Sequence, residues 1–351
     1  MATIQRVAEL AGVSTATVSR ALAGKTSVAP ATQRRVEEAA RQLGYVISAS
    51  ASSLASGRTR NVGVVLPFLG SWFYSAVLNG AHTALEEAGY DITLYHLDSV
   101  PLGQKSDQDN PRRKRLLEEF LLRGRVDALI AVSLELSDHE RESLHHVGKP
   151  LVGLGGPLPG FPTLALDDPA VARLATEHLI ALGHRRIAYI GGDLSLSVDF
   201  NLPARRLDGY EQALRHAGIE VDPGLIYPGD FTISGGYKAA RQLLEDPTVH
   251  PTAIFAASDE MAIGTVLAAR ELGRRIPEDL SVIGIDGHEL AQLLDLTTIE
   301  QFPVEQGRLA AQTLLGVLED HQPTPPPENT PLRYEVVARA STAAPSETPL
   351  S

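Results

Sequence analysis

Two patterns of hydrophobic positions divide the chain. In the first part, apolar residues recur three and four positions apart, which predicts short helices. One helix covers residues 4–11 and ends at Gly12, and the next begins after Ser14, a plausible N-cap. A third begins near Pro30 and stops at Gly44. Two short helices joined by a glycine-containing turn are typical of a helix-turn-helix unit.

From Asn61 onward, apolar runs of strand length alternate with helical stretches. The runs are NVGVVL, YDITLYHL, DALIAVSL, PLVGLG, TLAL, RIAYIGG, LIYPGD, AIFAAS, SVIGID and YEVVARA. Helical periodicity marks stretches between them, such as SAVLNGAHTALEEAG and EMAIGTVLAARELG. This alternation predicts parallel sheets with helices on both faces, and ten strands suggest two doubly wound lobes. Ligands bind such sheets at the carboxyl ends of the strands.

Length and composition agree with a multidomain globular protein. The length of 351 residues suits two or three domains. A composition of 43% hydrophobic and 21% charged residues is ordinary for a globular protein. No run approaches the 18 apolar residues of a membrane span, and MATIQRVAEL lacks the apolar core of a secretory signal. We therefore expect a cytoplasmic protein. Because the chain has no cysteine, disulfides and thiolate sites are excluded.

Charge is unevenly distributed along the chain. The net charge is −12, yet residues 1–60 hold eight Lys and Arg against three acids, a net of +5. The remainder carries −17. A small basic head on a large acidic body is typical of a protein that contacts phosphates through one domain only. The alternative is that the basic residues cluster by chance.

The second predicted helix exposes small polar residues and one arginine. Its outward positions are Thr15, Ala16, Thr17, Ser19 and Arg20. Small hydroxyl side chains let a backbone approach phosphates closely, and arginine can read a guanine edge with two hydrogen bonds. The alternative is a three-helix bundle with a solvated polar face.

The head resembles the DNA-binding domain of the lactose/galactose repressor (LacI/GalR) family. The resemblance lies in TIQRVAELAGVSTATVSRALAG and VAPATQRRVEEAARQLGY, within residues 1–46. It implies that residues in and just before the second helix read bases and contact phosphates. The base-reading positions fall on Thr15, Ala16 and Arg20, and the phosphate contacts on Ser14, Thr17 and Ser19.

A segment of small residues follows, which we assign to a hinge over residues 47–60. By composition, SASASSLAS is a linker. The family resemblance implies instead a helix that forms on DNA and inserts a leucine into the minor groove, and Leu54 stands at that place. Ser52 and Ala55 stand where the family often has arginine, which weakens the expected contact.

The resemblance continues through the body, residues 61–342. It rests on TEHLIALGHRRIAYIGG, AIFAASDEMAIGTVLAARELGRRIPEDLSVIGIDG and LTTIEQFPVEQGRLAAQTLL. It implies the fold of periplasmic sugar-binding proteins, two lobes with a small molecule between them. By analogy the first lobe takes 61–162 and 300–328, and the second takes 163–299 and 329–342. Residues 343–351 are expected to form a disordered tail.

The resemblance also implies the effector-binding residues. Arg206, Asp286 and Phe231 fall on an arginine, a carboxylate and a ring-stacking aromatic of the family. In the first lobe, Ser71, Trp72 and Phe73 fall in a ligand-contacting segment. The alternatives are a surface cation for Arg206 and a turn-forming residue before glycine for Asp286. For Phe231 and Trp72 the alternative is ordinary core packing. Where the family carries a carboxylate after KPLV, this chain has Gly155 and Gly156, so no particular sugar is inferred.

Other chemistries find no support in the motifs. The glycine-rich segments do not complete a dinucleotide-binding pattern, the histidines have no metal-ligand spacing, and no nucleophile elbow occurs. We expect no catalytic residues, metal or cofactor. Asp167 and Asp168 are interpreted as the turn at the start of a helix before Pro169.

These observations predict a transcriptional regulator, most simply a repressor. It would bind double-stranded operator DNA as a homodimer and respond to a sugar or sugar derivative. The alternative is the sugar-binding protein of a transporter with an unrelated N-terminal extension, which the basic head opposes. An α/β enzyme would need a catalytic constellation. The effector, the operator sequence and the direction of the response are not predicted.

Overall fold

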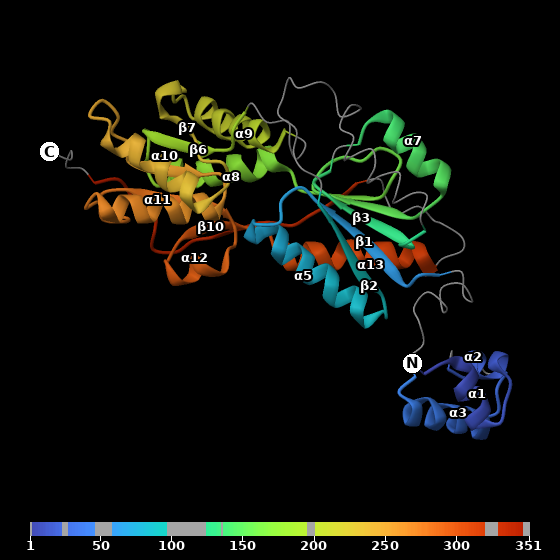
Figure 1. The fold of residues 1–351 in the computed structure, drawn as a ribbon. Coiled ribbons are helices and arrows are strands. Elements are labelled where there is room, and N and C mark those ends of the chain that lie inside the picture. Colours follow the sequence, from blue (N-terminus) through green and yellow to red (C-terminus); the bar gives the residue numbers. More distant parts are fainter. Residues whose placement is uncertain are drawn as a thin grey trace. The chain divides into compact units, whose positions relative to one another are not determined.

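The computed structural model describes residues 2–22, 27–45, 58–96, 124–134, 136–194, 201–319 and 329–346. The chain forms two compact units, Met1–Arg60 and Asn61–Ser351 (Figure 1). Most of the predicted hinge, including Leu54, lies outside the described residues. Within the described parts, no helix combines the length and apolar character that crossing a bilayer requires.

The head is a bundle of the three predicted helices. They are α1 (Ile4–Ala11), α2 (Thr15–Leu22) and α3 (Pro30–Leu43). Each helix contributes one fully buried valine to the small core, Val7, Val18 and Val36. Gly12 and Gly44 end α1 and α3 in the left-handed region, with φ of 63° and 61°, a conformation that a side chain would disfavour. The predicted helix-turn-helix is therefore confirmed.

The body contains two six-stranded sheets. The first has the order β11-β5-β4-β3-β1-β2 and the second β12-β10-β9-β8-β6-β7. Strands of the first sheet are β1 (Asn61–Leu66), β2 (Asp91–His96), β3 (Ala128–Val132), β4 (Leu151–Leu154), β5 (Thr163–Ala165) and β11 (Thr330–Pro331). Strands of the second are β6 (Ile187–Gly191), β7 (Ile226–Pro228), β8 (Ala253–Ala256), β9 (Ser281–Asp286), β10 (Thr297–Glu300) and β12 (Glu335–Val337). All neighbours run parallel except β12, which runs antiparallel to β10.

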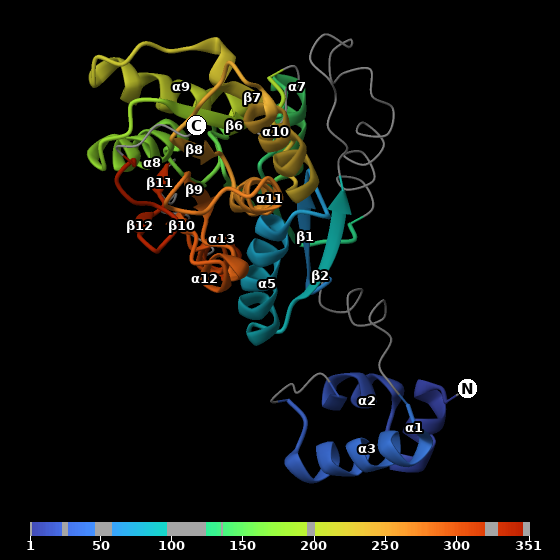
Figure 2. The same cartoon turned by 90° about the vertical axis from the view of Figure 1, so that its left-hand side faces the viewer.

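Helices cover both faces of each sheet, as expected for strands that are buried on both sides (Figures 1 and 2). On the first sheet, α5 (Trp72–Glu87) and α13 (Pro303–Glu319) lie side by side on one face and α7 (Asp138–Val147) lies on the other. On the second sheet, α8 (Asp168–Ala181) packs with α9 (Leu202–His216), and α10 (Ile233–Glu245) packs with α11 (Asp259–Glu271). The short helix α12 (Glu289–Leu293) joins β9 to β10. The predicted doubly wound architecture is confirmed.

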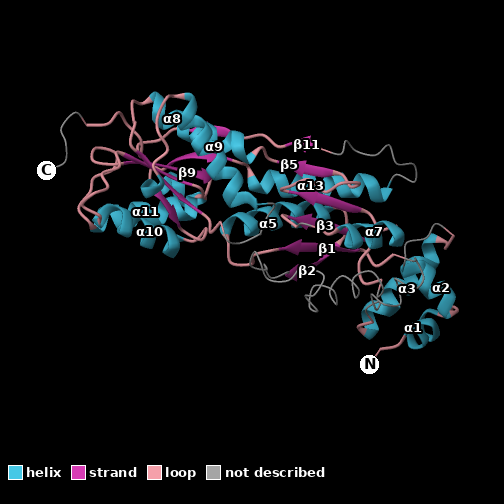
Figure 3. Cartoon of the chain, turned by 90° about the horizontal axis from the view of Figure 1, so that it is seen from above, coloured by secondary structure: helices cyan, strands magenta, loops and turns pink. Residues whose placement is uncertain are grey.

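The lobe boundaries lie a few residues later than the sequence suggested. Thr163–Ala165 pairs with β4, and Thr330–Pro331 pairs with Thr163–Ala165, so both segments belong to the first lobe and not to the second. The chain passes between the lobes after β5, after β10 and after β11 (Figure 3). The predicted boundaries at 162 and 328 were wrong because the sheet that a strand joins depends on its pairing partners and not on its own sequence.

Ordered structure also continues into the predicted tail. The Ala343 carbonyl accepts a hydrogen bond from His184 at 2.9 Å, and its amide donates to Ser281 Oγ at 3.1 Å. The body therefore includes Ala343, where we expected disorder to begin.

Candidate functional site

A cavity of about 510 Å³ lies at the carboxyl ends of strands from both sheets. From the first lobe, the segment after β1 and the end of β2 contribute Ser71, Phe73, Tyr74 and His96. From the second lobe, Arg206, Phe231 and Asp286 line the wall. This is the position at which doubly wound sheets bind ligands.

Five of the six residues predicted to bind an effector line this cavity. They are Arg206, Asp286, Phe231, Ser71 and Phe73. Trp72 does not line it, which corrects that prediction. Trp72 is the first residue of α5, and its ring stacks instead on His288 with 4.4 Å between ring centroids.

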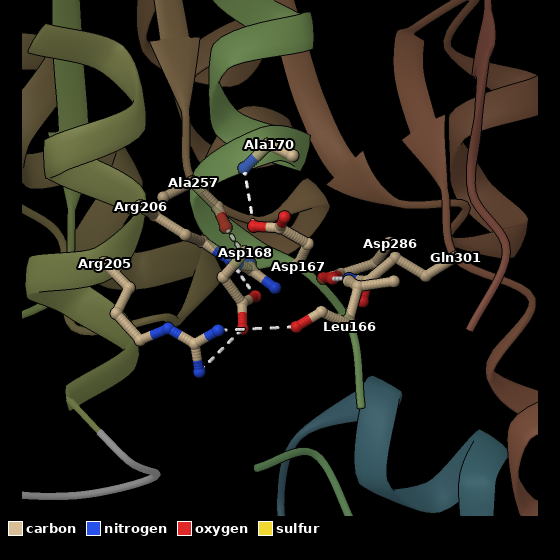
Figure 4. A network of polar contacts seen from close by, with 9 residues as sticks. All are labelled: Leu166, Asp167, Asp168, Ala170, Arg205, Arg206, Ala257, Asp286 and Gln301. Atoms are coloured by element: carbon tan, nitrogen blue, oxygen red, sulfur yellow. Dashed lines mark hydrogen bonds and ion pairs between the residues drawn. The ribbon is translucent and has the colours of Figure 1, made fainter. Parts of the chain in front are cut away.

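Arg206 is a buried cation held by the second lobe. Only 4% of the residue is exposed, and its Nε donates to Asp168 Oδ1 at 3.2 Å. A second nitrogen of the guanidinium donates to the carbonyl of Ala257, the residue after β8 (Figure 4). Arg205 approaches the other oxygen of the Asp168 carboxylate at 3.6 Å. Burial raises the pKa of Asp168, and the Arg206 guanidinium opposes that shift. The pairing orients the arginine before any ligand binds.

Asp286 is the last residue of β9 and has a φ of 134°, a conformation that favours glycine. It lies opposite Glu300 in the register of β9 and β10, which brings Gln301 beside it. Gln301 Nε2 donates to Asp286 Oδ1 at 2.5 Å. Burial raises the pKa of Asp286 well above its usual range, and the Arg206 charge opposes this effect.

A second buried carboxylate holds the turn that follows Asp286. Asp259 Oδ2 accepts the amides of Gly287 at 2.9 Å and His288 at 2.8 Å. Its other oxygen accepts the Thr298 hydroxyl at 2.7 Å. Burial raises the pKa of Asp259 to about 7, and these donors oppose the shift. Asp259 thus supports the backbone on which Asp286 is presented.

Aromatic side chains supply an apolar wall. Phe231 follows Asp230, and both have positive φ, of 52° and 53°, so the loop after β7 turns sharply at the cavity. A Cβ on Gly192 would overlap the Phe231 ring, so the absence of a side chain there makes room for it. Phe73 and Tyr74 form an edge-to-face pair in the opposite lobe. Flat apolar faces near a few charged groups are suited to a ring that carries hydroxyls.

Several lining residues were not predicted. Asp168 was interpreted only as part of a helix start, and Asp167 does cap α8 by accepting the Ala170 amide at 3.1 Å. The further role of Asp168 depends on α9 packing against α8, which no local motif signals. Glu260, in the first turn of α11, and Gln301, directly after β10, also line the cavity. The position of Gln301 immediately after a strand could have indicated it.

The head presents its predicted contact residues on one face of α2. Thr15, Ala16, Ser19 and Arg20 are exposed, while Val18 and Ala21 face the core. Ser14, also exposed, accepts the Thr17 amide at 3.2 Å, which confirms it as the cap of α2. The Arg20 side chain folds back on its own helix, with Nε donating to the Ala16 carbonyl at 3.2 Å. Such a weak intrahelical bond leaves Arg20 free to turn toward another acceptor.

Comparison with known proteins agrees with both parts. Residues 3–48 match the family described as bacterial regulatory proteins, lacI family, and residues 176–342 match the periplasmic binding protein-like domain. The ribose operon repressor of Escherichia coli K12 is 36% identical over 321 residues, which cover 90% of this chain and 92% of that protein.

Solved structures give the same answer. The lac repressor dimer bound to operator and the anti-inducer ONPF has a TM-score of 0.82 and 28% identity, covering 98% of this chain and 99% of that one. A LacI family regulator from Enterococcus faecium with bound ribose has a TM-score of 0.67 and 27% identity, covering 81% and 99%. The proteins matched are transcriptional regulators and not enzymes, and a transporter's binding protein would leave the match of the head unexplained. The chain therefore belongs to the lacI family of bacterial regulatory proteins.

Proposed function

We propose that this protein is a DNA-binding transcriptional repressor whose affinity for its operator is controlled by a sugar-like effector in the cavity between the lobes. The observation that carries the proposal is the pre-oriented Arg206, held by Asp168, in the same cavity as Asp286 and Phe231. The relatives support it, since they include a ribose operon repressor, a repressor dimer on operator and a regulator with bound ribose.

The residues of the cavity favour an uncharged effector. Asp168, Glu260 and Asp286 line it together with one buried guanidinium, and two nitrogens of that guanidinium already bond to the protein. An added phosphate or carboxylate would enter a desolvated space whose one guanidinium is already paired, and burying a charge without a partner is costly. Carboxylates and a guanidinium are well suited to hydrogen bonding with hydroxyls. We therefore assign the site to a neutral sugar or nucleoside.

Thermal unfolding against a ligand panel tests this assignment. The panel holds ribose, other pentoses and hexoses, nucleosides and the matching sugar phosphates. A ligand at one hundred times its Kd stabilises the folded state by about 2.7 kcal/mol, which is readily seen as a rise in Tm. The proposal expects a rise with a neutral compound and none with its phosphate. A rise with the phosphate alone would overturn the assignment.

DNA binding is tested separately, with the full chain and a library of random duplexes. Selected duplexes should contain two related half-sites, because a homodimer presents two heads. Anisotropy titrations should show affinity that falls steeply with salt concentration, and the stabilising compound should change it. The chromosome lies in the cytoplasm of bacteria, so that is where we propose the protein acts. Salt-independent or absent binding would refute the proposal.

A further inference from the structure

The N-terminus of α5 lacks a cap from its own residues. Ser71 occupies the N-cap position, but its side chain makes no capping hydrogen bond to the helix. The first amides of a helix have no partner within it, and a side chain or ligand usually satisfies them. Here the partner for the Trp72 amide comes from the other lobe.

Glu260 supplies that partner. It lies in the first turn of α11, and its Oε2 accepts the Ser71 hydroxyl at 3.0 Å and the Trp72 amide at 3.3 Å. Since α5 follows β1 of the first sheet and α11 follows β8 of the second, these bonds cross between the lobes. Both Ser71 and Glu260 also line the cavity.

Burial raises the pKa of Glu260, and the hydrogen bonds from Ser71 and the Trp72 amide oppose that shift. Helix N-termini carry partial positive charge, and Glu260 lies in the first turn of one 13-residue helix and bonds to the start of a 16-residue helix. Two helix ends that belong to different lobes therefore offset part of the cost of burying this carboxyl group. If the lobes separated, the interaction with α5 would be lost.

A ring stack lies beside these bonds. The Trp72 indole packs on the His288 ring with 28° between the planes. His288 is 7% exposed, and its Nδ1 accepts the Leu290 amide at 3.0 Å, which fixes the ring on the second lobe. Consecutive residues at the start of α5 therefore contact two separate elements of the second lobe.

We infer that Glu260 is a positioning residue that holds the lobes closed around the cavity. This inference rests on the proposed function for its link to effector binding. A site that is complete only in the closed form binds with an apparent affinity reduced by the fraction of closed molecules. By raising that fraction, Glu260 increases effector affinity.

The distance between the lobes in effector-free protein tests the inference directly. Because the chain has no cysteine, Glu142→Cys in the first lobe and Glu220→Cys in the second, both at exposed positions, allow paired dyes to be attached. Doubly labelled chains are mixed with excess unlabelled chain so that transfer within one subunit is measured. Glu260→Ala should lower the transfer efficiency, since the lobes spend more time apart.

Matched variants separate this role from a general loss of structure. Glu260→Gln keeps an acceptor oxygen and should restore most of the efficiency, while Ser71→Ala removes one bond and should give an intermediate value. Glu289→Ala changes an exposed acid in the first turn of α12 in the same lobe and should change nothing. If Glu260→Ala does not fold, the inference is still tested by the other two variants. Ser71→Ala should then give a lower transfer efficiency than the wild type and Glu260→Gln.

Ribose titrated by calorimetry provides the second readout. Loss of hydrogen bonds to a charged group should weaken ribose binding roughly tenfold or more in Glu260→Ala, with Tm close to wild type. Wild-type transfer efficiency in a folded Glu260→Ala protein overturns the inference. Failure of ribose to bind the wild-type chain counts against ribose as the effector, and the effector-free transfer measurement still decides the role of Glu260.

Discussion

At the scale of single residues, the buried pair of Arg206 and Asp168 links stability to effector binding. Arg206→Ala removes a cation that is 4% exposed and leaves Asp168, 3% exposed, without its main partner. Breaking a buried pair in this way costs about 3–5 kcal/mol. We expect a matching fall in the free energy of unfolding, measured with urea, together with loss of the effector response.

A double variant distinguishes the two effects. Arg206→Met with Asp168→Asn removes both charges, so it should recover much of the stability while effector binding stays absent. Recovery of both properties would show that Arg206 supports only the fold.

Arg20 is the residue that we predict to read a base. It is exposed on α2 and held only by a weak bond to its own helix. Arg20→Ala should cost roughly 1–3 kcal/mol at the selected operator and relax the preference at one base position in each half-site. Anisotropy titrations on operator and random duplexes measure both. An equal loss on the two duplexes would reduce Arg20 to a phosphate contact.

His184 predicts how the body responds to acid. It is 1% exposed and contacts Thr252, Ser281 and the Ala343 carbonyl. Burial lowers the pKa of His184 below the ordinary 6.5, so the unfolded chain takes up a proton more readily than the folded one. The contribution of neutral His184 to the free energy of unfolding is therefore complete above pH 6.5. It is lost as the pH falls from 6.5 through the lowered pKa.

Urea unfolding across this range, compared with His184→Gln, isolates the effect. The wild type should lose more stability than the variant between pH 7.5 and 5.5, while His178, whose pKa burial also lowers, stays in both proteins. Parallel curves would contradict the assignment.

At the scale of elements, α5 and α13 approach each other through glycines. A Cβ on Gly307 would overlap the Val77 carbonyl, and one on Gly80 would overlap the Val304 carbonyl. Close backbone approach of this kind requires the absence of side chains. Gly307→Ala should therefore force the helices apart and cost about 1–3 kcal/mol.

The same helix contains its own control. A Cβ at Gly316 would meet no atom within 4 Å, so Gly316→Ala should stabilise by about 0.5–1 kcal/mol through helix propensity. Chemical denaturation of the two variants gives opposite signs if the contact matters. Stabilisation by both would show that the helices adjust without cost.

Elements with strong apolar patterns were predictable, and those whose burial depends on partners were not. The run SVIGID is β9 along its whole length. By contrast, β10 is TTIE, in which Thr297 and Thr298 are completely buried because the side chains of Ser341 and Asp259 provide bonds. Two residues make up β11, too few for any periodicity. Polar strands and two-residue strands carry no signal that local reading can use.

The residues of the candidate site also fall into those that were predicted and those that were not. Arg206, Asp286 and Phe231 were found by resemblance, and all three line the cavity. Trp72 was misplaced because its ring follows the start of α5 toward His288, a direction that depends on how the lobes meet. Glu260 was missed because its two partners lie 188 and 189 positions away in sequence, beyond the reach of any local motif.

At the scale of the whole molecule, Leu54 tests whether the segment between head and body is a linker or a lever. It lies outside the described residues, so its role stays a prediction. Inserting a leucine unstacks a base step at a cost of a few kcal/mol, which is recovered by contacts that bent DNA allows. Leu54→Ala should leave folding and effector binding unchanged, weaken operator binding and reduce bending in a circular-permutation gel assay. Wild-type bending would support a plain linker.

The first lobe is built from segments that lie far apart in the sequence, and this sets the order in which the domains can fold during synthesis. The head is complete at Leu43, whereas the first lobe needs α13 and β11, which end at Glu319 and Pro331. A ribosome adds about 5–20 residues per second, so β3 and β4 wait many seconds with the face that α13 will cover still bare. Both lobes are finished almost together, close to the end of translation. The DNA-reading head therefore folds well before the part of the molecule that governs it exists.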